Sequence, residues 1–527
     1  MPITRSILIT FIMFCLVCCT TPENSSTKTP TSEPTLVVAV PTLQIKLKNE
    51  YPNIIFILTD DMEADAITFM PKTKELIGSQ GATFTNFYIS LALCCPSRTT
   101  MLRGQYMHNT QISGNQLPDG GFDKFYQLGL EQSTMATWLQ QAGYNTALFG
   151  KYLNEYPGTA GPTYIPPGWT EWYSPVAGNP YRNFNYTLNE NSNPVVYGEE
   201  PEDYATDVIS NKAQDFIQRN VKAGTPFFAF ISVFAPHTPS APAPRHAGLY
   251  SDLVLPRGPS FNEADMTDKS QSYNELGLLA DKQIAKMEDL YRKRAQSLQA
   301  VDELTMAIFN QLESLGQVEN TYIIFTSDNG YHMGQHRLIQ GKNTPLEEDV
   351  LVPFLIRGPG ITPNSIVNSL AGNIDLAPTF SEIAGVIPPD FVDGRSLLPL
   401  LSKETQTAPW RDAYLLERSG QDTEAFIFDS SITFNPQPGL LEPPDSELGP
   451  KYTWTFASPY AGLRTKDYSY VEYEIGDVEL YDMKNDPYQL NNIARTADPE
   501  LINMLHNWLL SLKDCKGELC RQADTHP

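Results

Sequence analysis

Two short apolar runs of the chain end in side chains that offer oxygen ligands. Asp60 and Asp61 follow the run 54–58, and Asp328 and Asn329 follow the run 322–325. An aspartate pair after a single strand could be a helix cap, but a matching Asp-Asn pair after a second strand argues against that reading. Oxygen ligands without histidine or thiolate suit Ca²⁺ or Mg²⁺ better than zinc. The spacing therefore predicts a site for a hard divalent cation.

Cationic side chains follow the other runs of this kind. Lys151 comes after the run 146–149, His237 comes after the run 227–234, and Lys342 lies in a Gly-Lys-Asn sequence. Each lysine alone would be read as a solvated surface charge. Their places at strand ends and in a glycine turn favour a binding role instead.

The elements that position these residues are predicted from the apolar runs themselves. Continuous apolar runs of four to eight residues fit strands that are buried on both faces of a parallel sheet. Helix-like stretches lie between them, at 135–142 and at 285–315. This alternation predicts an α/β fold with a large, mostly parallel central sheet and helices on both faces. Ligands of such sheets bind beyond the carboxyl ends of the strands, so the four runs should line one crevice.

Two irregular segments and a change in the pattern of predicted secondary structure divide the rest of the chain. Residues 157–202 are rich in Pro, Gly, Tyr and Asn and are expected to be a surface excursion over the crevice, with a second loop at 257–271. Strand-like runs at 461–473 and 478–482, followed by a helix at 500–512, predict a smaller carboxyl-terminal α+β subdomain with an antiparallel sheet.

The most specific local feature is the sequence Cys94-Cys95-Pro96-Ser97-Arg98. A bare Cys-Cys pair is usually a buried structural pair, but Cys-x-Pro-Ser-Arg is the sulfatase signature, and the chain resembles the sulfatase family. The resemblance covers roughly residues 50–520. It continues in family order through Asp60-Asp61, Gly143-Tyr144, Gly150-Lys151, Pro236-His237, Asp328-Asn329-Gly330, Gly341-Lys342, 354–360 and Asp486-Pro487.

The resemblance implies an alkaline-phosphatase-like fold and a defined chemistry. Cys94 would be oxidised to formylglycine by a formylglycine-generating enzyme. One hydroxyl of the hydrated aldehyde would attack sulfur, and the second would allow sulfate to be expelled. Asp60, Asp61, Asp328 and Asn329, together with residue 94, would hold calcium or magnesium, with calcium usual in the family.

The cationic residues receive roles from the same resemblance. Arg98 would hold the hydrated formylglycine and the ligand carboxylates, and Lys151 and Lys342 would bind sulfate oxygens. His237 would orient or protonate the leaving-group oxygen, a task suited to imidazole. Counted with a divalent cation, the three aspartates, Arg98 and the two lysines leave a local charge of +2, which suits a sulfate ester.

The sequence departs from many family members after Lys151. They carry a histidine two residues later, where this chain has Lys151-Tyr-Leu-Asn154. This stretch resembles the branch of N-acetylglucosamine-6-sulfatases and extracellular endosulfatases. We hypothesise that His332 or His336 takes over part of the missing base function, and the alternative is that both are surface histidines.

The amino terminus predicts export. Arg5 and the short apolar run 7–18 are typical of a signal peptide, and Leu16-Val-Cys-Cys19 resembles a bacterial lipobox with Cys19 as the lipidated residue. An ordinary cleaved secretory signal is the alternative. We expect four segments: a signal peptide at 1–19, a disordered tether at 20–48, a catalytic domain at 49–387 and a carboxyl-terminal subdomain at 388–527. Export favours a disulfide between Cys515 and Cys520.

Composition bounds the function further. A net charge of −24 disfavours nucleic acid as a partner, and the membrane is expected to be reached only through the lipid anchor. The predicted function is hydrolysis of a sulfate monoester on a sugar, such as a 6-sulfated N-acetylglucosamine, with aryl sulfates as incidental substrates. A phosphonate or phosphodiester hydrolase and a non-catalytic glycan-binding lipoprotein are the alternatives. Because the chain lacks the long basic insert of the endosulfatases, exo action is favoured.

Overall fold

The computed structural model describes residues 51–401, 409–419 and 458–525. These described residues belong to one compact unit. The predicted signal peptide, Cys19 and the tether lie outside the described residues. The predicted boundary between residues 387 and 388 stays a prediction.

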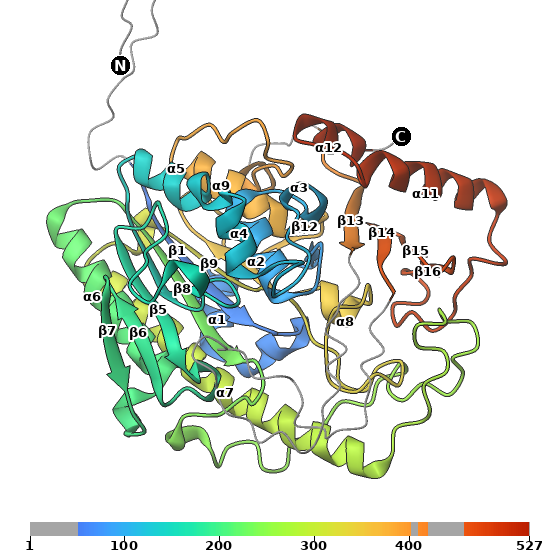
Figure 1. The fold of residues 1–527 in the computed structure, drawn as a ribbon, viewed down its shortest axis with the longest axis horizontal. Helices are drawn as coiled ribbons and strands as arrows, with labels where there is room; N and C mark the ends of the chain where they lie inside the picture. Colours follow the sequence, from blue (N-terminus) through green and yellow to red (C-terminus); the bar gives the residue numbers. More distant parts are fainter. Residues whose placement is uncertain (1–50, 402–408, 420–457, 526–527) are drawn as a thin grey trace, which may run out of the picture. The chain divides into compact units, whose positions relative to one another are not determined.

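A ten-stranded sheet forms the centre of this unit (Figure 1). Its middle consists of four neighbouring parallel strands in the order β9 (Thr321–Ser327), β1 (Asn53–Asp60), β8 (Phe227–Pro236) and β4 (Asn145–Gly150). All residues of β1, β8 and β9 are buried, as expected for strands covered on both faces. The predicted α/β fold and all four predicted strands are confirmed.

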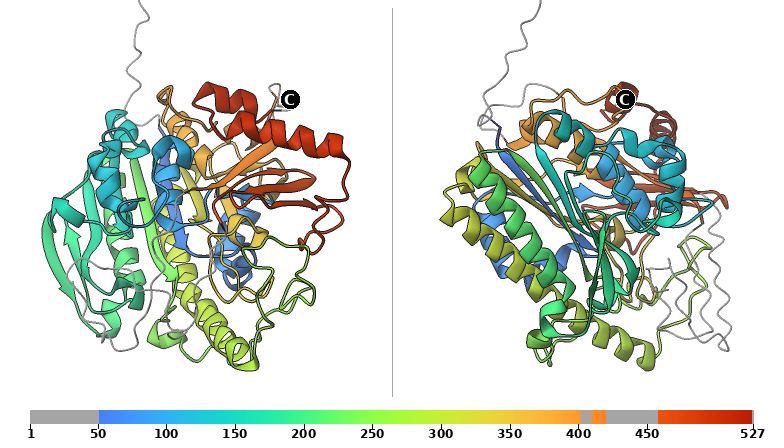
Figure 2. Two further views of the ribbon diagram at one scale, coloured as in Figure 1. Left: turned by 45° about the vertical axis from the view of Figure 1, so that its right-hand side comes forward. Right: turned by 60° about the vertical axis from the view of Figure 1, so that its left-hand side comes forward.

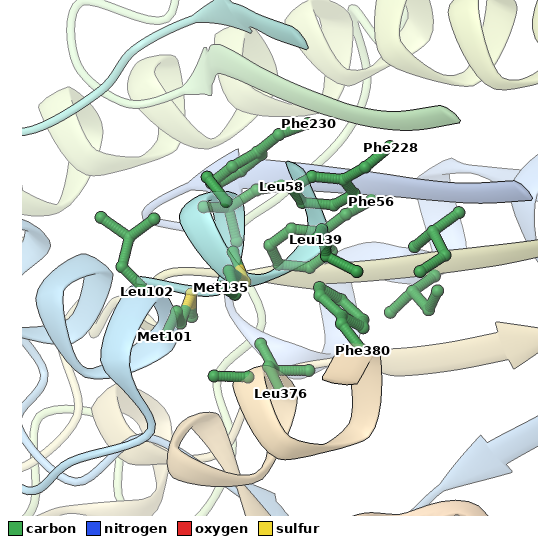
Figure 3. Packing of buried hydrophobic residues seen from close by; sticks show 14 of the residues in the cluster. Phe56, Leu58, Met101, Leu102, Met135, Leu139, Phe228, Phe230, Leu376 and Phe380 are labelled. Carbon is green, nitrogen blue, oxygen red and sulfur yellow. The ribbon is translucent and has the colours of Figure 1, made fainter. Parts of the chain in front are cut away.

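Helical layers cover both faces of the sheet, and successive residues of β1 point alternately into them. Phe56 and Leu58 pack with residues of α2 (Cys94–Arg103), α5 (Met135–Gln141) and α9 (Leu376–Ile383), as Figure 3 shows. Ile55 and Ile57 pack on the other face with residues of α6 (Ala205–Ala223) and α7 (Asp281–Ser314). The two layers are seen edge-on in Figure 2 (right). α5 and α7 confirm the two predicted helices.

The segment 157–202 was predicted to be an irregular surface excursion, but it contains three strands. It contributes β5 (Glu171–Gly178), β6 (Tyr186–Glu190) and β7 (Asn193–Tyr197), which extend the sheet beyond β4. β5 pairs parallel with β4, and β6 and β7 follow antiparallel. Prolines and a bulge between Pro175 and Ala177 interrupt the alternation that would have revealed these strands.

Three strands complete the opposite side of the sheet. β10 (Phe354–Arg357) pairs antiparallel with β9 and with β2 (Ala82–Phe84), and β11 (Ser365–Val367) lies outermost. A separate two-stranded sheet joins β3 (Phe87–Tyr88) and β12 (Ala371–Gly372). The short helices are α1 (Pro71–Thr73), α3 (Met107–Thr110), α4 (Gly121–Gln127), α8 (Glu347–Val350) and α10 (Leu398–Leu401).

The carboxyl-terminal part forms the predicted smaller antiparallel sheet. Its strand order is β13 (Ala413–Arg418), β14 (Tyr460–Thr465), β15 (Tyr468–Tyr473) and β16 (Val478–Asp482). The helices α11 (Pro499–Leu512) and α12 (Glu518–Ala523) follow, and a disulfide joins Cys515, which comes after α11, to Cys520 in α12. None of the helices in the described ranges is long and apolar enough to cross a bilayer.

Candidate active site

The carboxyl ends of the four central strands bring the predicted polar residues together. Asp60 is the last residue of β1, Lys151 directly follows β4, His237 directly follows β8, and Asp328 directly follows β9. All four are at most 4% exposed. Because these strands are parallel neighbours, their ends meet at one edge of the sheet, which is where the crevice was predicted.

Cys94 faces this edge from the first position of α2. Its Sγ lies 3.4 Å from Asp60 Oδ1, 3.8 Å from Asp61 Oδ1 and 2.8 Å from Lys342 Nζ. Burial raises the pKa of the Cys94 thiol well above its usual value, and the nearby Lys151 and Lys342 act in the opposite direction. A residue at position 94 therefore touches both the carboxylates and the cations of the site.

The oxygen-bearing side chains surround one another closely. The Asn329 amide donates to Asp61 Oδ1 at 2.7 Å, and the Asp61 backbone N–H donates to Asp328 Oδ1 at 3.0 Å. Among the described residues, Asp61 Oδ2 and Asn329 Oδ1 are buried acceptors without a hydrogen-bond donor. Leaving buried oxygens unsatisfied is costly. A hard cation satisfies such atoms, so the donor set fits Ca²⁺ or Mg²⁺.

The electrostatics of the carboxylates agree with this fit. Burial raises the pKa of Asp60, but the charges of Lys151, His237 and Arg98 outweigh burial and hold it well below its usual value. Burial and the negative charge of Asp60 raise the pKa of Asp328 to about 6. The side chains of the site thus do not supply enough positive charge to keep Asp328 ionised at its usual pKa. A divalent cation would supply that charge.

Arg98, on α2, connects β8 with the residues that follow β4 and β9. Its guanidinium donates to Asp328 Oδ2 at 2.8 Å, to Ser232 Oγ at 2.7 Å and to the carbonyl oxygen of Lys151 at 3.0 Å. Its planar group with several donors suits this task better than an ammonium group does. Ser232 was not identified from the sequence, because it lies inside the apolar run of β8.

The two lysines reach the carboxylates from opposite parts of the fold. Lys151 Nζ lies 2.7 Å from Asp60 Oδ2, and Lys342 Nζ lies 2.6 Å from Asp61 Oδ1. Lys342 comes from the long connection between β9 and α8. Both lysine side chains are at most 7% exposed, and Lys342 Nζ also lies 2.8 Å from Cys94 Sγ.

His237 is oriented by its own backbone neighbour. Its Nδ1 lies 2.7 Å from the carbonyl oxygen of Thr238. A carbonyl oxygen only accepts, so Nδ1 carries a proton and Nε2 is the atom directed at the site, 3.5 Å from Asp61 Oδ2. The ring of Tyr181 lies 4.6 Å from the His237 ring, centroid to centroid, and 5.1 Å from Lys151 Nζ. Tyr181 was missed because its segment was predicted to be an irregular surface loop.

The two histidines suggested as replacement bases occupy different environments. His332 Nδ1 lies 2.9 Å from Asp349 Oδ1, and its backbone pairs with Gly341, the residue before Lys342. His336 is fully buried, and its Nδ1 lies 2.7 Å from Glu263 Oε2. Neither is a surface histidine. His332 is therefore connected to the loop that carries Lys342, whereas the hydrogen bonds described for His336 lead to Glu263 and Ser260.

The comparison with known families agrees with this constellation. A family model named Sulfatase matches residues 52–386. The chain belongs to the sulfatase family. It is a sulfuric ester hydrolase with the alkaline-phosphatase-like fold of that family.

Curated sulfatases resemble the chain over most of its length. It is 37% identical to the human N-acetylglucosamine-6-sulfatase over 481 residues, which is 89% of this chain and 86% of the human protein. It is 42% identical over 395 residues to a putative extracellular sulfatase Sulf-1 homolog of Caenorhabditis elegans, covering 73% of this chain but 55% of that protein.

Solved structures share the fold at lower identity. A protein solved in complex with its substrate D-glucosamine-2-N,6-O-disulfate has a TM-score of 0.68 at 24% identity, over 90% of this chain and 99% of that chain. A phosphonate monoester hydrolase of Agrobacterium radiobacter has a TM-score of 0.64 at 19% identity, over 90% of this chain and 96% of that chain. These likenesses concern the fold.

Proposed function

We propose that this sulfatase removes the 6-O-sulfate from a terminal, sulfated N-acetylglucosamine or a related glucosamine residue of a glycan. The proposal rests chiefly on one observation, the convergence of carboxylate oxygens and the Lys342 ammonium group at the Cys94 side chain. The relatives named N-acetylglucosamine-6-sulfatase, which align with 89% of the chain, support the choice of sugar.

The nucleophile would derive from Cys94, converted to formylglycine by a formylglycine-generating enzyme. The hydrated aldehyde supplies one hydroxyl for attack on sulfur and a second that permits release of sulfate. Arg98 and Lys342 orient residue 94, since Arg98 fixes Asp328 and Lys342 lies 2.8 Å from Sγ. Lys151 and Lys342 bind the sulfate oxygens, and His237 Nε2 gives a proton to the leaving sugar oxygen. His332 assists the release of sulfate as a base.

The divalent cation would be held by Asp60, Asp61, Asp328 and Asn329, together with residue 94. Calcium is our first choice and magnesium the second, because all four side chains offer oxygen only. The cation supplies positive charge to a sulfate oxygen. Removing it with a chelator should abolish turnover, and added calcium should restore it.

We also propose that the protein is exported and anchored to a bacterial membrane through lipidated Cys19. The signal-like run and the lipobox-like Leu16-Val-Cys-Cys19 support this proposal. Labelling with a radioactive fatty acid, compared between the unaltered chain and Cys19→Ala, tests it.

Mass spectrometry of the Cys94 peptide is the decisive experiment for the nucleophile. Conversion to the aldehyde replaces one sulfur and two hydrogens by one oxygen. An unmodified thiol in active protein from the native host would contradict the proposal.

The neighbouring cysteine offers a matched control for the kinetics. Cys94→Ala should lose all turnover, whereas Cys95→Ala removes an equally buried thiol and should keep most of it. Equal losses in the two variants would contradict the role of residue 94.

A substrate panel separates the related activities. N-Acetylglucosamine 6-sulfate should be turned over with a higher kcat/KM than nitrophenyl sulfate or a phosphonate monoester. A preference for the phosphonate would favour the phosphonate hydrolase alternative.

A further inference from the structure

Arg294 lies in the helical layer opposite α2, and its side chain contacts backbone atoms at the base of the active site. It lies on α7, is 1% exposed, and donates from NH2 to the carbonyl oxygen of Asp61 at 2.5 Å and from NH1 to that of Pro236 at 3.3 Å. It also pairs with the carboxylate of Glu63. Its hydrogen bonds therefore join the ends of β1 and β8, next to a carboxylate of the site and next to His237.

The backbone of Asp61 needs such support. Asp61 has a φ of +63°, a conformation that non-glycine residues adopt rarely and that the surrounding structure must hold in place. Its N–H donates to Asp328 Oδ1 at 3.0 Å, and its carbonyl oxygen accepts from Arg294. Asp328 thus fixes the backbone N–H of Asp61, and Arg294 fixes its carbonyl oxygen.

We propose that Arg294 is a positioning residue for the divalent-cation site, which fixes the backbone of Asp61 so that its carboxylate meets the cation. The proposal rests on the cation site proposed above and adds a residue outside the family signature. Arg294 is not among the proposed cation ligands or sulfate-binding residues. It acts through Asp61, and through Pro236 it also fixes the start of the segment that carries His237.

The chemistry of the arginine side chain fits this task. Its planar guanidinium can donate to two separate carbonyl oxygens while it pairs with Glu63, which a lysine ammonium cannot do with the same geometry. The guanidinium also lies over the ring of Tyr331, 4.4 Å from its centroid. Tyr331 is two residues after Asn329, so Arg294 contacts a third segment of the site.

Calcium affinity of the full chain tests the proposal without relying on turnover. Arg294→Lys should bind calcium about 10–100-fold more weakly than the unaltered chain in competition with a chromogenic chelator, as expected for residues that orient metal ligands. Arg292→Lys is the matched control. Arg292 lies on the same helix and also donates to a backbone carbonyl, that of Leu253 at 2.8 Å, outside the site.

The outcomes are distinct. Wild-type calcium affinity in folded Arg294→Lys, or an equal loss in Arg292→Lys, would overturn the proposal. If Arg294→Lys does not fold, Glu63→Gln carries the test, because Glu63 is partly exposed and the substitution removes the negative charge that holds the guanidinium in place. Weaker calcium binding in Glu63→Gln supports the proposal, and unchanged binding overturns it. Failure of the unaltered chain to bind calcium would instead contradict the cation site itself.

Discussion

Tyr181 shows how one side chain outside the signature can set the chemistry of the site. It comes from the connection between β5 and β6, and its ring packs against the imidazole of His237 and beside Lys151. Aromatic pairs of this kind contribute about 0.5–1.5 kcal/mol. Such an amount is enough to bias the orientation of the imidazole, whose proposed task is to point one nitrogen at the leaving group.

We therefore predict that Tyr181→Leu slows the hydrolysis of sugar sulfates more than that of nitrophenyl sulfate. A sugar alkoxide needs a proton to leave, whereas nitrophenolate leaves without one, so only the sugar substrate depends on a well-oriented His237. The expected loss of kcat is up to about tenfold for the sugar. Tyr181→Phe, which keeps the ring, is the control. An equal loss for both substrates would contradict the role.

A second prediction concerns His332 and the release of sulfate. If His332 acts as the base in that step, His332→Ala should keep a rapid burst of nitrophenol but slow the steady-state rate by about 10²-fold. Stopped-flow absorbance separates the two phases. His506→Ala, at a half-exposed histidine on α11, is the control. Unchanged burst and steady state in His332→Ala would exclude this role.

Among the elements, the sequence predicted best those strands that are buried on both faces, because such burial requires a continuous apolar run. β1, β4, β8 and β9 are continuous apolar runs, so their type and their polar carboxyl ends could be predicted. β5, β6 and β7 could not be predicted, because they extend the sheet one after another from the edge of β4 and because Pro175, Pro194 and neighbouring glycines break their pattern. The approach of Lys342 to Cys94 depends on the path of a long loop, and spacing along the chain does not encode it.

A partly buried ion pair joins α3 to β13 and predicts a pH dependence of stability. His108 Nδ1 lies 2.8 Å from Glu417 Oε2, and Nε2 lies 2.9 Å from the carbonyl oxygen of Cys515. Burial acts to lower the pKa of His108, but the hydrogen bond and the charge of Glu417 raise it to about 9. The pair therefore connects α3 with the carboxyl-terminal antiparallel sheet and with Cys515 of the disulfide.

The sign of the effect follows from the raised pKa. A histidine that binds its proton more tightly in the folded state stabilises the fold fully below its unfolded pKa of about 6.5, and this contribution is lost as pH rises through about 9. We predict that His108→Gln removes about 1–3 kcal/mol at pH 6 and little at pH 10. Urea unfolding at both pH values measures this, with His506→Gln as control. A loss that does not change with pH would contradict the assignment.

At the scale of the whole molecule, the charge of −24 opposes the approach of any anionic substrate. The positive groups proposed to bind the sulfate, Lys151 and Lys342, are nearly buried. Salt screens exposed charges over a Debye length of about 10 Å at 0.1 M, but it screens buried pairs much less. Long-range repulsion and short-range attraction should therefore respond differently to ionic strength.

We predict that raising sodium chloride from about 0.02 M to about 0.15 M increases kcat/KM for a polysulfated oligosaccharide several-fold, because screening weakens the repulsion that slows its approach. A singly sulfated monosaccharide should change much less, since it carries one charge, and kcat should stay constant for both substrates because the buried site is little screened. Initial rates at low substrate concentration measure the effect. A steep fall of kcat/KM for the oligosaccharide would instead mean that a basic surface attracts the chain of the substrate, and it would favour action within polysulfated chains over action at their ends.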